Sequence, residues 1–124
     1  MSTPHTGTVV AFITDFFFVA KIEAPLRTLG LFSVFAQTEV EYFAAMHKYL
    51  PTLSIIDLGL KGVDPIDIIR KAKGDPPLEA IPLLCFGSHV MVDKLQAARD
   101  AGAEEVVSSG QFSAHLPTLV SQYL

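Results

Sequence analysis

Two aspartates follow short apolar segments in this 124-residue chain. Asp15 comes directly after the β-prone run of residues 9–14, and Asp57 ends the run of residues 53–57. If both runs are neighbouring strands of one parallel sheet, their carboxylates lie at the same edge of that sheet. Paired carboxylates with waters and a phosphate are typical ligands of Mg²⁺. The alternative is that each aspartate caps a loop or the helix that follows it.

Other polar residues follow the remaining apolar runs. Ser88 and His89 come shortly after residues 81–86, and Ser108 and Ser109 close the short run that begins at Glu105. A lone histidine without a metal-spaced partner is expected to be a loop residue. The chain has no G-x-G-x-x-G motif and no Walker loop, so we expect no enzyme. A small flavodoxin-like enzyme or cofactor carrier is the minor alternative.

The elements that must position these residues alternate along the chain. Nearly continuous apolar runs, typical of buried parallel strands, are separated by segments of helical period. Strict alternation predicts an α/β fold, a three-layer α/β/α sandwich with right-handed crossovers. Pro25 and Pro117 fall inside predicted helices and should kink them. The predicted strands span residues 9–14, 31–36, 53–57, 81–86 and 105–108, and the predicted helices span residues 17–29, 38–49, 65–73, 90–101 and 112–123.

The composition is that of one soluble domain. Half of the residues are hydrophobic and 18% are charged, which provides enough apolar material for a core. We expect a single domain over residues 9–124, preceded by a flexible segment over residues 1–8. The net charge is −4 with 9 basic residues spread along the chain, so we expect no nucleic-acid partner and no membrane surface.

The cysteine content and the start of the chain indicate a cytoplasmic location. Cys85 is the one cysteine, lies inside an apolar run and is expected to be a buried thiol. Residues 1–8 are polar and lack the pattern of a signal peptide. The longest apolar runs are also too short for a membrane helix. We therefore expect a cytoplasmic protein.

Three segments, correctly spaced and in order, carry a family resemblance. They are residues 53–65 (LSIIDLGLKGVDP), residues 81–86 (IPLLCF) and residues 97–105 (AARDAGAEE). They resemble the receiver domains of two-component response regulators, and the resemblance covers nearly the whole chain after residue 8. It implies a flavodoxin-like parallel sheet of order 2-1-3-4-5, with Asp57 as the phosphoacceptor. It also implies Asp15, Asp57 and Gly59 as Mg²⁺ ligands, and a histidine kinase or a downstream signalling protein as partner.

Five positions depart from the receiver pattern. Thr14 stands where receivers have one member of an acidic pair, and Gly87 stands where the fourth strand ends in Ser or Thr. Ser109 occupies the place of a lysine after the fifth strand. Lys61 replaces a loop proline, and Val106 replaces an aromatic residue. The resemblance therefore implies a degenerate pseudo-receiver that acts through protein contacts, with phosphorylation vestigial or absent.

The alternative is a working phospho-receiver that binds Mg²⁺ weakly and is phosphorylated on Asp57. In that interpretation, Lys61 stands in for the missing lysine and Ser88 supplies the missing hydroxyl. Otherwise Lys61 is a solvated loop lysine and Ser88 is a turn serine that caps the next helix.

Apolar residues in the second half of the chain predict a partner surface. Val90 and Met91, together with Leu116, Val120 and Tyr123, provide more apolar surface than one core face needs. We therefore expect a homodimer or a partner surface on the fourth or fifth helix.

Phe16, Phe17 and Phe18 follow Asp15 directly. Helical geometry predicts that two of the three are buried. The third should be exposed near the aspartates, where it would block access or contact a partner.

Overall fold

The computed structural model describes residues 7–124, and strands alternate with helices along them as predicted. Residues 1–6, most of the predicted flexible segment, lie outside the described residues, whereas Gly7 and Thr8 belong to the first strand. The strands are β1 (Gly7–Phe12), β2 (Leu31–Ala36), β3 (Leu53–Asp57), β4 (Leu83–Gly87) and β5 (Glu105–Ser108). The helices are α1 (Phe16–Thr28), α2 (Glu39–Tyr49), α3 (Pro65–Gly74), α4 (Val92–Asp100) and α5 (Ser109–Ser121).

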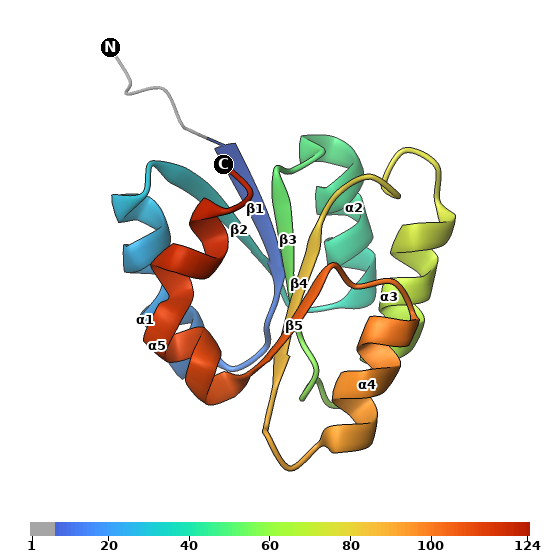
Figure 1. Cartoon of the computed structure of the whole chain (residues 1–124). Coiled ribbons are helices and arrows are strands. Elements are labelled where there is room, and N and C mark those ends of the chain that lie inside the picture. Colours follow the sequence, from blue (N-terminus) through green and yellow to red (C-terminus); the bar gives the residue numbers. More distant parts are fainter. Residues whose placement is uncertain (1–6) are drawn as a thin grey trace.

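The five strands form one parallel sheet in the order β2-β1-β3-β4-β5. Helices α1 and α5 cover one face of this sheet, and α2, α3 and α4 cover the other (Figure 1). The predicted three-layer α/β/α sandwich and its strand order are therefore confirmed. The carboxyl ends of the strands meet at one edge, the lower edge in Figure 1, where the helices begin.

Each strand of the centre contributes side chains to two cores, one on each face of the sheet. In β1, Val10 and Phe12 pack toward α2, α3 and α4, while Val9 and Ala11 pack toward α1 and α5. This alternation has the period of two expected for a strand. Because both faces are covered, both sets of side chains must be apolar, which explains the continuous hydrophobic runs in the sequence.

One buried hydrogen bond links α2 to the central strand. The Tyr42 hydroxyl lies 2.7 Å from the Ser54 hydroxyl, and Ser54 is fully buried. Burial raises the pKa of Tyr42 far above its ordinary value, so Tyr42 stays neutral. A buried polar group without a hydrogen-bond partner lowers the stability of the fold, and here each hydroxyl is the partner of the other.

Cys85 lies in β4 and is fully buried, as predicted. Burial raises the pKa of its thiol to about 12. The side chain therefore stays protonated and packs as a small hydrophobic residue.

The β4 and α4 boundaries differ from the predicted ones for local reasons. β4 begins at Leu83 because Pro82 has no amide to donate and the Ile81 amide is used in a turn with Leu78 (3.0 Å). α4 begins at Val92 because the preceding residues form a turn, in which the Met91 amide donates to the Ser88 carbonyl (2.9 Å).

α5 begins three residues earlier than predicted. Ser108 caps it by accepting from the Gln111 amide (3.1 Å), and the Gln111 side chain accepts from the Ser108 amide (3.2 Å). This capping box has the sequence signature Ser-x-x-Gln, which could have located the start. The predicted kink at Pro117 is confirmed, since His115 two residues earlier has non-helical angles (φ −125°, ψ 22°). α1, by contrast, continues past Pro25 to Thr28.

No helix within residues 7–124 has the length and apolar character needed to span a membrane.

Replacing Tyr42 by Phe should lower the free energy of unfolding by about 1–2 kcal/mol, because the buried Ser54 hydroxyl loses its partner. The double variant Tyr42→Phe, Ser54→Ala removes both hydroxyls and should recover most of that loss. Urea denaturation of the two variants and the unchanged protein measures both effects. A double variant less stable than Tyr42→Phe alone would contradict this account.

Candidate functional site

Asp57 is the last residue of β3, the strand that pairs with both β1 and β4. Its carboxylate is half-buried, and its Oδ1 accepts a hydrogen bond from the Gly59 amide (2.7 Å). A Cβ atom at Gly59 would lie 3.1 Å from that same Oδ1. Glycine therefore lets the loop after β3 fold back closely over the carboxylate.

Asp15 lies at the same edge, after β1, and caps α1. Its Oδ1 accepts from the Phe17 amide (2.9 Å), so the predicted alternative of a helix cap describes this residue correctly. Its negative charge also acts on Asp57 and raises the pKa of that carboxyl. The two aspartates therefore belong to one electrostatic site, which we call the Asp57 pocket.

Several influences compete in the pKa of Asp57, and their net result raises it above the ordinary value. Burial contributes most by disfavouring the charged form. The Gly59 amide lowers the pKa by donating to the carboxylate, and Asp15 raises it by repulsion. Lys94 in the first turn of α4 lowers it by attraction. Lys94 is the one pocket residue that no motif in the sequence indicated.

Thr14 and Lys61, two of the predicted neighbours of Asp57, form no hydrogen bond or ion pair with it among the described residues. Thr14 is half-buried between β1 and α1, next to Asp15 in the chain. Lys61 is exposed in the loop after β3, and among the described residues none of its hydrogen bonds or ion pairs joins it to Asp57. The cation that lowers the pKa of Asp57 is Lys94 of α4 instead.

Gly87 is the last residue of β4, and side chains pack closely against it. A Cβ atom there would lie 3.2 Å from Cβ of Leu58 and 3.5 Å from Sδ of Met91. The Leu58 amide, in turn, donates to the Phe86 carbonyl (2.8 Å), which fixes the chain after Asp57 against β4. The space beside Gly87 is therefore filled by apolar side chains.

Ser88 lies in the turn that follows. Its Oγ accepts from the Val90 amide (3.4 Å), and its carbonyl accepts from the Met91 amide (2.9 Å). These bonds make Ser88 a turn serine, and Met91 rather than Ser88 occupies the N-cap position of α4.

The end of β5 continues directly into α5. Ser108 is both the last residue of the strand and the helix cap, so Ser109 is already the first helical residue. Val106 is buried and packs in the core beneath α4. The Ser109 and Val106 positions therefore carry a short hydroxyl and an aliphatic side chain, not a cation and an aromatic ring.

The three phenylalanines contradict the predicted pattern of two buried and one exposed. Phe16 is 74% exposed and Phe17 is 88% exposed, while Phe18 stacks on Phe86 (4.8 Å) and on Phe112 (5.8 Å). The reason is that α1 starts at Phe16. The buried stripe of α1 has a spacing of four residues from Phe18 onward, and the first two side chains lie outside it and are exposed.

The predicted partner surface is wrong for Leu116 and Val120. They are 3% and 0% exposed and, with Phe112, form the stripe by which α5 packs on the sheet. Tyr123 is half-buried, and its hydroxyl donates to Glu105 (2.8 Å). Burial and Glu105 raise the pKa of this hydroxyl to about 12.

The other two residues of the predicted surface lie at the turn before α4. Val90 is 74% exposed, whereas Met91 is half-buried over Gly87. With exposed Val92, Phe16 and Phe17, Val90 forms a set of apolar side chains after β1 and β4, which we call the apolar rim.

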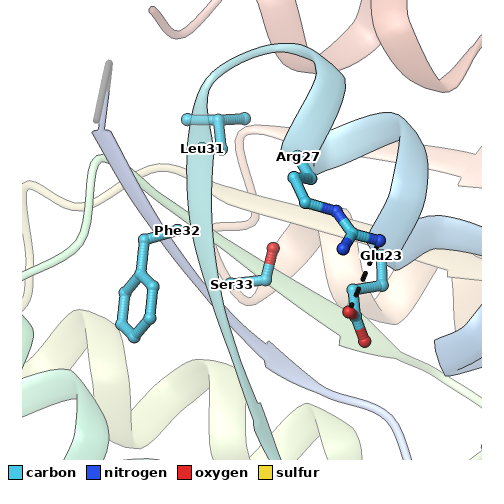
Figure 2. Close-up of a pocket in the computed structure, with 5 residues that line it drawn as sticks. All are labelled: Glu23, Arg27, Leu31, Phe32 and Ser33. Carbon is cyan, nitrogen blue, oxygen red and sulfur yellow. Dashed lines mark ion pairs between the residues drawn. The ribbon is translucent and has the colours of Figure 1, made fainter. Parts of the chain in front are cut away.

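A shallow hollow of about 220 Å³ lies elsewhere, against β2 and α1. Figure 2 shows its lining, in which Arg27 and Glu23 of α1 form an ion pair (3.8 Å) beside the strand. Leu31, Phe32 and Ser33 complete it from the amino-terminal half of β2. Asp57 lies at the carboxyl edge, so the hollow does not belong to the candidate site.

A divalent metal has few protein ligands available at the Asp57 pocket. Among residues 7–124, no group of three or more His, Cys, Asp or Glu side chains could hold a metal ion. Asp15 and Asp57 each have one oxygen engaged by a backbone amide. Two carboxylates suit Mg²⁺ only with waters or a phosphate completing its shell.

No protein-family model matches the chain, and no curated protein is detectably similar in sequence. Among solved structures, a candidate response regulator from Chloroflexus aurantiacus is 22% identical, with 98% of each chain covered and a TM-score of 0.85. The chemotaxis response regulator CheY4 of Vibrio cholerae is 15% identical, with 94% of this chain and 98% of that one covered and a TM-score of 0.83. The Mn²⁺-bound response regulator Rcp1 is 14% identical, with 95% and 94% covered and a TM-score of 0.80. The chain therefore has the fold of response-regulator receiver domains, as the resemblance implied.

Asp57→Asn should make the protein more stable at neutral pH. Because the folded pKa of Asp57 is raised, the unchanged protein loses stability as the pH rises through that pKa, and asparagine does not ionise. The advantage of the variant should disappear below the ordinary pKa of an aspartate. Urea denaturation at several pH values measures it, with Asp93→Asn on α4 as the control. A stability difference independent of pH would contradict the predicted shift.

The two classes of phenylalanine should respond differently to substitution. Phe17→Ser should change the free energy of unfolding by less than about 0.5 kcal/mol, because the side chain is exposed. Phe18→Ala should cost about 2–4 kcal/mol through its lost stacking contacts. Denaturation curves compare the two, and a large loss in Phe17→Ser would show that Phe17 packs in solution.

Proposed function

We propose that this chain is a receiver-like domain of two-component signalling that acts as a pseudo-receiver. It works through contact with another protein, and phosphorylation of Asp57 is vestigial or absent. The fold and the position of Asp57 at the end of β3 support the signalling class. The role is one of binding rather than catalysis, in the cytoplasm.

The packing of Gly87 is the observation that carries the pseudo-receiver proposal. The resemblance implies that receivers carry a Ser or Thr at this position, and that its hydroxyl moves when the aspartate is phosphorylated. Here the position lacks a side chain, and the adjoining space is occupied by Leu58 and Met91. A hydroxyl group at the end of β4 could enter only if these side chains moved.

The rest of the expected transmission route is missing as well. Val106 is aliphatic and buried, so no aromatic ring on β5 can turn inward or outward. Ser109 is fixed in the first turn of α5 and cannot supply a cation. A phosphoryl group on Asp57 would therefore lack the usual groups that move β4 and β5.

The apolar rim supports action by contact. Phe16, Phe17, Val90 and Val92 are all strongly exposed at the carboxyl edge of the sheet. Contiguous exposed apolar patches mark protein interfaces, and we propose that these side chains contribute to one. The net charge of −4 favours a protein partner over nucleic acid or an anionic membrane. We propose a histidine kinase or a downstream signalling protein as that partner, with a homodimer through Val90 and Met91 as the second candidate.

A second candidate function is a Mg²⁺-dependent phospho-receiver. The proximity of Asp15 to Asp57 favours it, since a cation would relieve their repulsion. The structural neighbour Rcp1 is a response regulator in its Mn²⁺-bound form, which is consistent with that chemistry in this fold.

Acetyl phosphate with Mg²⁺ separates the two functions. We expect the intact mass of the protein to stay unchanged, because the site lacks a lysine after β5, the last residue of β4 is Gly87, and the Ser88 hydroxyl is engaged in the turn before α4. The variant Asp57→Asn is the matched control. An added phosphoryl group that is absent from Asp57→Asn would establish the phospho-receiver instead.

A further inference from the structure

The two edge strands of the sheet differ in how they are protected against pairing with another chain. At one edge, β5 has four residues and begins with the charged Glu105. Arg99 of α4 donates to the Val106 carbonyl (3.3 Å), so a side chain already engages the backbone of this strand. Short length, charge and cover are the usual means by which edge strands avoid further pairing. The β5 edge is therefore closed to a further strand.

β2 forms the opposite edge and has a different character. It has six residues and pairs with β1 on its inner side. Residues 29–38 contain no charged residue and no proline, although 18% of the whole chain is charged. A longer, apolar edge strand without charge or proline is a template on which another strand can pair.

The side chains beside β2 give this edge a neutral surface. On the α2 face of the sheet, Phe32 is partly exposed, and its ring centroid lies 5.8 Å from that of exposed Tyr49. On the α1 face, Figure 2 shows Ser33 beside the ion pair of Arg27 and Glu23. Both of these charged side chains are exposed, and their charges cancel. The edge therefore combines apolar side chains on one face with one charge of each sign on the other.

We propose that β2 pairs with β2 of a second copy of this chain, antiparallel and across a two-fold axis. A closed pair of identical copies uses the same surface on both, so that surface must complement itself. A two-fold axis perpendicular to the sheet reverses the strand direction, which gives an antiparallel ladder between the two edges.

Charge favours a second copy at this edge. Each copy has a net charge of −4, so two copies repel one another in general, and the neutral β2 edge is where that repulsion is least. The axis also brings α1 of one copy beside α1 of the other. Arg27 of each copy then approaches Glu23 of the other, and the opposite charges attract. This contact goes beyond the proposed function, because β1 separates β2 from the strand that carries Asp57.

Amide hydrogen exchange of the unchanged protein, measured in dilute and in concentrated solution, tests the strand pairing itself. A new ladder engages backbone amides of β2, so exchange in residues 31–36 should slow about tenfold or more on concentration. Exchange in β5 should not depend on concentration. Exchange in β2 that is the same at every concentration would overturn the proposal, whether the protein is a monomer or associates through the apolar rim.

Sedimentation equilibrium of two lysine variants tests where the copies meet. Ser33→Lys places like charges opposite one another in the ladder and should weaken association about tenfold or more. Val90→Lys, the matched control, places the same charge on the apolar rim and should leave association unchanged. Equal weakening by the two variants, or weakening by Val90→Lys alone, would overturn the proposal. If Ser33→Lys fails to fold, the exchange experiment decides alone. Neither experiment involves phosphorylation, so their failure leaves the acetyl phosphate test of the proposed function unaffected.

Discussion

The parallel pairing of β3 with β1 on one side and β4 on the other determines where Asp57 lies in the fold. Register places Asp57 opposite Phe86, so its neighbours are the chain after β1 and the turn after β4. Apolar side chains on both faces of the sheet fix this register, since a slip by one residue would exchange the two cores. The position of Asp57 is therefore set by the packing at the centre of the fold.

Electrostatics and packing act at this site in different ways. Burial and Asp15 oppose the ionised form of Asp57, while the Gly59 amide and Lys94 favour it. Packing leaves little space for a larger side chain at the end of β4, because Leu58 and Met91 fill the space beside Gly87. Asp57 is therefore a carboxylate with local partners of its own, as the proposed pseudo-receiver function requires.

The sequence was sufficient for the fold because parallel strands covered on both faces leave long apolar runs that alternate with helices. It also located Asp57, since an aspartate that ends a buried strand must lie at the sheet edge. It could not locate Lys94 as a pocket residue. A lysine in the first turn of a helix has no signature, and its direction depends on how α4 packs.

Helix phase explains the remaining errors. Leu116 and Val120 were predicted to be exposed, but a spacing of four residues from Phe112 places them on the buried stripe of α5. The exposure of Phe16 and Phe17 depends on Asp15 as the helix cap, which sets where α1 begins. In both helices the sequence shows which residues are apolar. Which of them are buried depends on where the helix begins and how it is rotated against the sheet, and the packing determines both.

The central claim is that occupation of the Asp57 pocket is not transmitted through β4 and β5. Two-dimensional NMR of the protein with beryllofluoride and Mg²⁺, which together imitate a phosphoryl group on an aspartate, tests it most directly. We predict that amide signals change only next to Asp57, in the loop that contains Gly59. Large changes at Gly87, Val106 and the first turn of α5 would contradict the claim and show a working switch.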